Sequence, residues 1–258
     1  MKKKLVTVLV VIAVVLALGI AGFFLIEEVP VQTEGNQKYF ANIFYGFRPS
    51  VIRENVDLYL TLALLALFNI SIQIFMPYLI LYYTEGLQME GYVLVMAPAI
   101  ILASIFTVFW GRVHDKVGFR ASMLPSLGLL CAGYILLYFF RSTALVFVGS
   151  LLMMCGYLAG TAVFGAVIRD YTPEGRAGMF QGLRIAGQVL IPGLVGPAIG
   201  AWVLRDAETV IGDDGTESFI PNQNIFLAAL IAAVVLGLFL ALLLYIMKKK
   251  TAKEAAHE

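Results

Sequence analysis

Long runs of apolar residues are the feature that most constrains how this chain can fold. A helix needs about 20 mostly apolar residues to cross the hydrocarbon core of a bilayer. Such runs cover approximately residues 5–26, 58–84, 91–113, 121–140, 143–168, 177–204 and 224–247. They lack the alternation of apolar and polar residues that is typical of membrane β-barrel strands. They therefore predict an all-α fold, a polytopic membrane helix bundle with about seven transmembrane helices.

The composition agrees with a lipid bilayer as the surroundings of the chain. Of the 258 residues, 60% are hydrophobic and 14% are charged, against about 25% charged residues in soluble domains. A net charge of +1 lacks the clustered excess of basic residues that a nucleic-acid partner requires. Cys131 and Cys155 each lie inside an apolar run, where cysteine acts as a small hydrophobic residue. No zinc pattern, phosphate-binding loop or catalytic triad is present, so we expect no metal, no cofactor and no enzymatic activity.

Basic residues in short loops stay on the cytoplasmic side of a membrane and so predict orientation. From the second apolar run onward, alternate loops are basic: they carry Lys38, Arg48, Arg53; Arg112, Lys116, Arg120; Arg169, Arg176; and Lys248, Lys249, Lys250, Lys253. The opposite loops carry only Arg141 and Arg205, and the loop 205–223 is acidic and rich in turn residues. This pattern predicts six helices with both ends in the cytoplasm, in a multi-pass protein of the cell membrane.

The first apolar run conflicts with that orientation. It follows the sequence MKKK, and its basic start, apolar centre and small residues resemble a signal segment that would send residue 27 outside. Three alternatives remain: the helix crosses with its lysines outside, it does not cross, or it had an upstream partner in a longer chain. We favour the longer chain, because it removes the conflict.

Residues 111–120, GRVHDKVGFR, concentrate charge between two apolar runs. Gly111 would permit close backbone approach and Gly118 a left-handed or otherwise tight turn. Asp115 needs a donor at the membrane edge, such as an arginine or a helix N-terminus, whereas Lys116 and Arg120 can contact anionic lipid. The alternative is an ordinary basic cytoplasmic loop. His114 in this loop and His257 in the tail are expected to have no chemical role.

This stretch resembles the signature loop of the major facilitator superfamily. The family pattern is matched by Gly111, Asp115, Lys116, Gly118 and Arg120, and Phe119 stands where a basic residue is usual. The loop also has the position that it occupies in the family, between the second and third helices of a six-helix half. Residues 168–200 look like the loop and pore helix near the end of the carboxy-terminal half, and residues 38–55 look like the linker between the halves.

The resemblance implies a domain organisation and a partner. Residues 1–27 would be the last helix of an amino half or a signal-anchor-like helix, 28–56 a cytoplasmic linker with an interfacial helix, 57–247 a six-helix carboxy-terminal bundle, and 248–258 a cytoplasmic tail. Aromatic residues at 39–47 favour the interfacial helix, which Pro49 would end. Alone, the bundle would turn its polar pore face toward lipid. An amino half or a second copy is therefore the expected partner.

The family works by alternating access, in which two bundles rock about a central site. The resemblance implies that the charged turn acts as a latch, with Asp115 held by the opposite bundle in one state and released in the other. Arg169 is its expected partner within this chain. A contact that differs between the two states is sufficient to bias their equilibrium.

Polar residues within the apolar runs are candidates for the substrate path, because they are costly unless they face a cavity or a partner. The second run offers Asn69, Gln73 and Tyr78, the last beyond a break at Pro77, and the sixth run offers Gln181, Arg184 and Gln188. The alternative is hydrogen bonding between helices. Tyr82 and Tyr83 are expected in the external aromatic belt.

The stretch IPGLVGPAIG in the sixth run predicts a bent helix with close neighbours. Its prolines disturb helical hydrogen bonds and its glycines keep the surface thin. The residues concerned are Pro192, Gly193, Gly196, Pro197 and Gly200. A hinge and simple tight packing are both open interpretations. Gly156, Gly160 and Gly165 in the fifth run favour packing.

The predicted function is secondary transport of a small organic solute, with a sugar or glycoside as the first candidate because amides and tyrosines suit hydroxyl groups. The alternatives are multidrug-type efflux and a scaffold or regulatory protein that retains the fold without transport. No Asp, Glu or His lies in the middle of an apolar run. If transport is symport with protons or sodium, the coupling carboxylates would belong to the other half.

Overall fold

The structure is a computed structural model that describes residues 45–173, 175, 177–211 and 217–254. All of these residues belong to one compact unit, Phe40–Glu258. The first apolar run, the start of the aromatic segment 39–47 and His257 lie outside the described residues.

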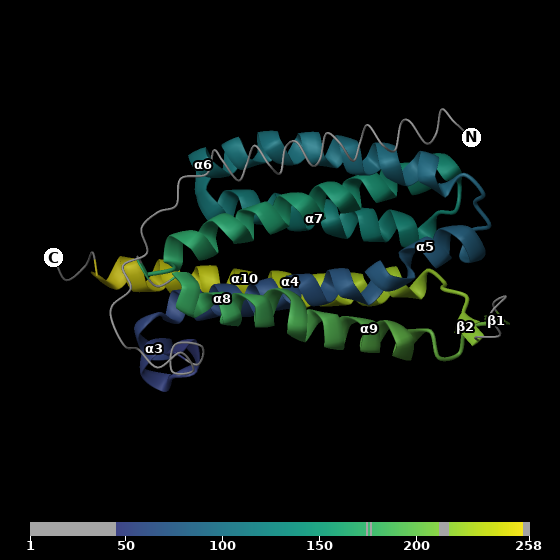
Figure 1. The fold of residues 1–258 in the computed structure, drawn as a ribbon. Helices are drawn as coiled ribbons and strands as arrows, with labels where there is room; N and C mark the ends of the chain where they lie inside the picture. The colour runs from purple at the N-terminus through teal and green to yellow at the C-terminus, as the bar shows by residue number, and fades with distance from the viewer. Residues whose placement is uncertain (1–44, 174, 176, 212–216, 255–258) are drawn as a thin grey trace, which may run out of the picture. The chain divides into compact units, whose positions relative to one another are not determined.

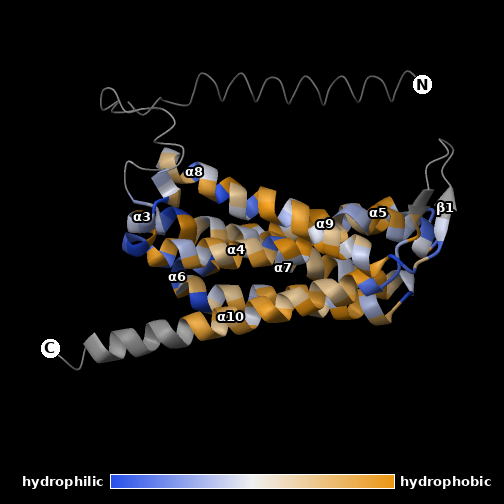
Figure 2. Cartoon of the chain, turned by 90° about the horizontal axis from the view of Figure 1, so that it is seen from below, coloured by the Kyte–Doolittle hydropathy of each residue, from blue (hydrophilic) through white to orange (hydrophobic). Residues whose placement is uncertain are grey.

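Five helical segments of the described chain are long and apolar enough to cross a membrane. They are Val56–Gly86, Tyr92–Phe139, Thr143–Tyr171, Gly178–Val203 and Asn224–Leu243. Figure 1 shows them packed along one another as a bundle. In Figure 2 hydrophobic residues dominate the length of these helices, and hydrophilic residues gather toward their ends. The prediction of a polytopic all-α membrane bundle is confirmed.

The 48-residue helix α6, Tyr92–Phe139, supplies two of the spans. At 1.5 Å per residue it would be about 72 Å long if straight, more than twice the roughly 30 Å of a bilayer core. It is not straight, because Gly118 has non-helical backbone angles, φ 77° and ψ 179°, and the chain reverses there. The predicted runs 91–113 and 121–140 are therefore the two arms of α6, and the described chain contains six spans.

The span Val56–Gly86 changes its helical form along its length. It comprises α4 (Val56–Phe75), the 3₁₀ turn η2 (Met76–Tyr78), α5 (Leu79–Leu81) and the π turn η3 (Tyr82–Gly86). Pro77 lies in η2 and cannot donate a backbone hydrogen bond, which accounts for the predicted break.

The span Gly178–Val203 is also composite. It contains α8 (Ala177–Ile185), the π turn η4 (Ala186–Leu190) and α9 (Ile191–Val203). Pro192 is the second residue after η4, so the wider π turn lies where the proline ring would crowd the carbonyl of residue 188 in a regular α-helix. The remaining spans are α7 (Thr143–Tyr171) and α10 (Asn224–Glu254).

The core is formed where α4 meets α6, α7 and α10. Phe75 of α4 packs edge-on against Tyr134 of α6 at 5.4 Å and contacts Phe226 of α10 at 5.7 Å. Ser71 lies among them and donates to the carbonyl of Ala229, 2.9 Å away. The second arm of α6 and α7 approach so closely that a Cβ at Gly133 or Gly156 would overlap the backbone of Met153 or Leu130. Gly156 and Gly160 thus serve packing, as expected.

Several expectations from the sequence need correction. The short turn η1, Tyr45–Phe47, ends before Pro49 with Arg48 extended between them, as expected, but Pro49 also begins a helix that was not predicted, α3, Pro49–Glu54, because proline suits the first helical position. Tyr82 and Tyr83 are fully buried rather than in an external belt, since their hydroxyls contact the carbonyl of Leu137 and the hydroxyl of Ser150. Helix α10 continues through Glu254 into the predicted tail.

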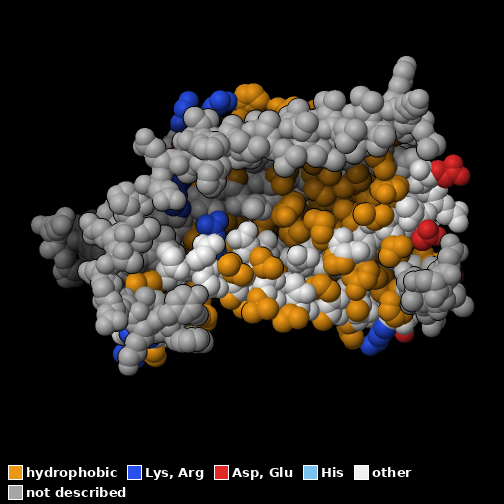
Figure 3. Space-filling view, in the orientation of Figure 1, with side chains coloured by type: hydrophobic (Ala, Val, Ile, Leu, Met, Phe, Trp, Pro, Cys, Tyr) orange, Lys and Arg blue, Asp and Glu red, His pale blue; other side chains and the backbone are white. Residues whose placement is uncertain are grey.

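The predicted loop 205–223 contains an antiparallel hairpin of β1 (Thr209–Ile211) and β2 (Glu217–Phe219). Its register pairs Thr209 with Phe219 and Ile211 with Glu217. On the face shown in Figure 3, acidic side chains lie near this hairpin and most basic ones lie at the opposite end. We call that opposite end, which holds Gly118 and the start of α8, the predicted cytoplasmic end.

Candidate functional site

The charged turn at the predicted cytoplasmic end depends on Gly118. Its backbone angles, φ 77° and ψ 179°, fall in a region that is essentially restricted to glycine. The prediction of a tight turn at Gly118 is confirmed. Gly111, in contrast, has nothing within 4 Å of the position of an added Cβ. The close approach expected there is absent from this conformation of the described chain.

A small network of polar side chains hydrogen-bonds across the turn on its buried side. The hydroxyl of Ser122 donates to the carbonyl of Gly118, 2.8 Å away, and lies 2.7 Å from Nδ1 of His114. Because a hydroxyl has one proton to donate, His114 must donate from Nδ1 to Ser122 when Ser122 donates to Gly118. The indole of Trp110 donates to the carbonyl of Ser122 at 3.3 Å.

His114 is therefore a buried part of the turn and not a loop residue without a partner, and it is only 8% exposed. This role was not predicted from the sequence. The available signal was the spacing of Trp110 and His114, and of Ser122 and Ser126, each four residues apart and so on one helix face.

The other charged residues of the turn point away from the bundle. Asp115, Lys116 and Arg120 are exposed, and no hydrogen bond or ion pair within the described chain reaches them. Arg169 instead pairs with its neighbour Asp170 at 3.5 Å, with both side chains exposed. The expected contact between Asp115 and Arg169 is therefore not made, because Asp115 faces outward. Phe119 packs against Phe164 with 5.8 Å between ring centroids, which anchors the turn to α7.

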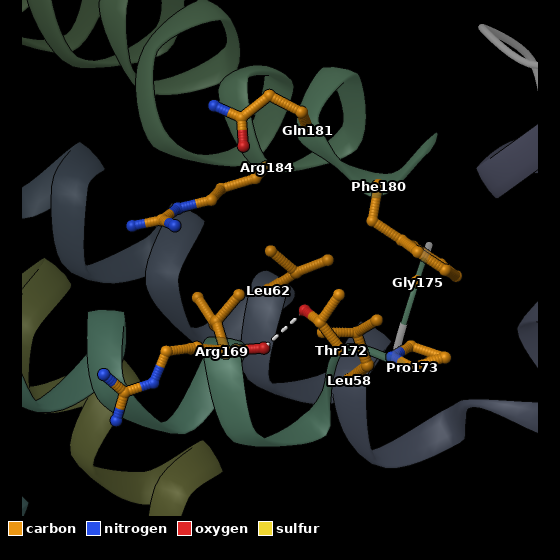
Figure 4. Close-up of a pocket in the computed structure, with 10 residues that line it drawn as sticks. Leu58, Leu62, Arg169, Thr172, Pro173, Gly175, Phe180, Gln181 and Arg184 are labelled. Carbon is orange, nitrogen blue, oxygen red and sulfur yellow. Dashed lines mark hydrogen bonds between the residues drawn. The ribbon is translucent and has the colours of Figure 1, made fainter. Parts of the chain in front are cut away.

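A cavity of about 200 Å³ lies nearby, between α4, α7 and α8 (Figure 4). Its floor is apolar and buried, formed by Leu58, Leu62, Ile168 and Phe180. Its polar residues are Arg169, Thr172, Gln181 and Arg184. The Thr172 hydroxyl donates to the carbonyl of Ile168 at 2.6 Å, drawn as the dashed line in Figure 4. The cavity thus joins Arg169, predicted for the gate, to Gln181 and Arg184, predicted for the substrate path.

The remaining path candidates lie along the contact between α4 and the α8–α9 span. Gly187 lies near the carbonyl of Leu62, Gly196 against Gln73, and Gly200 against Tyr78. Residue numbers rise together on both sides, so the two spans run parallel from the predicted cytoplasmic end. Gln73 and Gln188 are half-buried on these spans.

Asn69 and Tyr78 already have internal hydrogen-bond partners. Asn69 is buried, and its side-chain amide donates to the carbonyl of Leu65 at 2.9 Å. The amide thus turns back onto its own helix, and the place of Asn69 on the substrate path stays a prediction. The hydroxyl of Tyr78 donates to the carbonyl of Pro197, 3.1 Å away, on α9.

The predicted hinge divides into packed and open positions. Pro192, Gly196 and Gly200 are buried, whereas Gly193 is exposed and has nothing within 4 Å of an added Cβ. Pro197 is half-buried and remains inside α9. Gly196 and Gly200 therefore serve tight packing, and the non-α segment next to the prolines is η4, which contains Gln188.

Neither the thiols nor the acidic side chains suggest a metal site. Cys131 and Cys155 are free cysteines within the apolar bundle. Among the described residues, no three His, Cys, Asp or Glu side chains lie close enough to hold a metal ion.

These features define a polytopic membrane helix bundle with polar and charged groups set into apolar spans. Residues 5–149 and residues 92–258 each match the family model described as Major Facilitator Superfamily. The chain belongs to the Major Facilitator Superfamily. It is therefore a membrane secondary transporter by family, and the match leaves the substrate unspecified. No curated protein and no solved structure matches the chain.

Proposed function

We propose that this chain is the carboxy-terminal part of a transporter that moves a small organic solute by alternating access, together with an amino half or a second copy. The observation that carries this proposal is a set of partly exposed polar groups on α4 and on the α8–α9 span. Arg184, Gln73 and Gln188 are only half-buried, although they lie on spans that are otherwise apolar. Such groups at membrane depth call for a water-filled path or a partner.

A sugar or glycoside remains the first candidate solute. Hydroxyl recognition by this chain would fall to Gln73, Gln181 and Gln188, whose amides carry both donors and acceptors. These three glutamines make no hydrogen bond within the described chain, whereas Asn69 and Tyr78 are already bonded. The glutamines lie on two parallel spans that pack against each other, so a solute bound across the seam of these spans would contact both.

Asp115 is proposed as the contact with the other bundle in the closed state. It is exposed, lies beside the rigid turn at Gly118, and has no partner within the described chain. Its carboxylate can therefore form and lose a contact with the partner bundle at little cost to this bundle's own fold. The half-buried residues of the path would open and close as a consequence.

The experiment is reconstitution of the chain with and without a major facilitator amino half, followed by uptake of a panel of sugars, glycosides, carboxylates and cationic drugs into proteoliposomes. We expect uptake only from the combined halves or from a dimer, and loss of uptake when Asp115→Asn and Gln73→Ala are introduced together. Uptake by the isolated monomer would refute the partner requirement. Binding of a protein partner that survives both substitutions, without uptake, would favour a scaffold.

A further inference from the structure

The cavity between α4, α7 and α8 contains two cations for which the described residues offer no buried counterion. Of the ten described residues that line it, two are arginines and none is acidic. No hydrogen bond or ion pair within the described chain reaches the guanidinium of Arg184. Arg169 has only Asp170, in a pair whose side chains are 78% and 60% exposed and which solvent therefore screens.

The guanidinium of Arg184 lies beside α7, the helix that carries Arg169. Nη2 of Arg184 lies 3.8 Å from the position of a Cβ on Gly165, and Gly165 and Arg169 are four residues apart on the same face of α7. The head of Arg184 therefore lies about one helical turn from residue 169. Figure 4 shows both arginine side chains extending in the same direction from α7 and α8.

The walls of the cavity complement these charges. Leu58, Leu62 and Phe180 are each no more than 5% exposed and form an apolar floor. Gln181 and Thr172 add polar groups beside the arginines. The volume, about 200 Å³, is smaller than the roughly 300–1,000 Å³ of sites for drug-sized ligands. It suits one acidic group with a compact apolar body.

We propose that this cavity binds a small organic anion, with its carboxylate or phosphate oxygens between Arg169 and Arg184 and its apolar part on Leu58, Leu62 and Phe180. Guanidinium groups bind such oxygens by paired, charge-assisted hydrogen bonds. The anion is either a solute or the head group of an acidic lipid. The identification of the anion as a transported solute rests on the proposed transport function. The existence of the anion-binding site does not depend on it.

The test is equilibrium binding of benzoate to the full 258-residue chain in phosphatidylcholine nanodiscs, with benzamide as the uncharged probe of the same shape. We expect benzoate to bind at least about tenfold more tightly than benzamide, and inorganic phosphate to compete with it. Arg184→Gln should weaken benzoate binding about tenfold or more, and Arg169→Gln should weaken it less because Arg169 is more exposed. Arg205→Gln, at the opposite end, is the control and should bind as the unchanged chain does.

A second variant guards against misfolding of Arg184→Gln. Gln181 is exposed, so Gln181→Glu should leave the fold intact while placing a negative charge in the cavity. It should weaken benzoate binding about tenfold and weaken benzamide binding much less. Equal binding of benzoate and benzamide, or benzoate binding that neither variant weakens, would overturn the proposal.

Addition of phosphatidylglycerol to the nanodiscs separates the two sources of anion. If phosphatidylglycerol raises the benzoate Kd of the unchanged chain but not that of Arg184→Gln, the occupant is a lipid head group. If the Kd of the unchanged chain stays the same, the occupant is a soluble anion. Intact benzoate binding without uptake of any solute would remove the transport proposal alone. Uptake of an uncharged solute without benzoate binding would remove only the anion site.

Discussion

The Cα and Cβ atoms of Gln73 lie directly against Gly196, where an added Cβ would overlap them. This contact fixes α4 against α9 at the middle of two parallel spans, and the hydrogen bond from Tyr78 to Pro197 fixes them again farther along. The positions of Gln73 and Tyr78 on the candidate substrate path are therefore set by the contact between these two helices.

Gly196→Ala should destabilise the protein, because the methyl group would collide with the backbone of Gln73. Overpacking of this kind costs about 1–3 kcal/mol. Gly193→Ala, on the same helix, meets open space and should be neutral or slightly stabilising, since alanine favours a helix over glycine. Thermal unfolding in detergent measures the difference. Equal melting temperatures for the two variants would contradict the packing of α4 on α9.

Gly118→Ala should destabilise the bundle by about 1–3 kcal/mol, because φ 77° with ψ 179° is accessible essentially to glycine alone. Gly111→Ala, within the preceding helical turns and with free space around it, is the matched control. Denaturant unfolding followed by helical content would measure both. A tolerated alanine at position 118 would mean that α6 does not reverse there.

Ser122→Ala should cost about 1–3 kcal/mol, because it leaves Nδ1 of the buried His114 without its partner. Ser104→Ala is the control, since the exposed Ser104 bonds only to its own helix at Ile100. We expect little change in the melting temperature from the control. If Ser122→Ala is as stable as Ser104→Ala, the turn is not held by this network.

Asp115→Asn should leave the stability of this chain within about 0.5 kcal/mol of the original, because the carboxylate is exposed and unbonded within the described chain. In the reconstituted transporter it should lower solute uptake. Asp206→Asn, at the hairpin end and paired with Arg205, should affect neither quantity. Thermal unfolding and uptake by the same preparations provide the two measurements. An uptake rate unchanged by Asp115→Asn would exclude the latch.

The spans were predictable because each needs only a long apolar run, and the reversal at Gly118 was predictable because charge and glycine interrupt such runs. The direction in which a side chain points was harder to predict from the sequence. Tyr82 and Tyr83 have the depth of belt residues, yet helix packing directs them inward to Leu137 and Ser150. Sequence patterns report depth in the membrane better than they report neighbours.

The cavity and the hairpin were beyond prediction for a similar reason. Arg169 and Arg184 belong to different spans, and the approach of Arg184 to α7 results from the packing of α4 against both α7 and the α8–α9 span, which no local spacing encodes. The strands β1 and β2 are three residues each, too short for a pattern of alternation to distinguish them from the turn residues around them. The π turn η4 was also not predictable, because it depends on contacts with α4 as well as on the nearby Pro192.

The reversal at Gly118 gives the predicted cytoplasmic end a mechanical property. Because α6 has helical residues directly on both sides of this glycine, no loop separates its two arms. A protease that needs an extended substrate would find none at this bend, and a displacement of one arm along the membrane normal would pull the other arm with it.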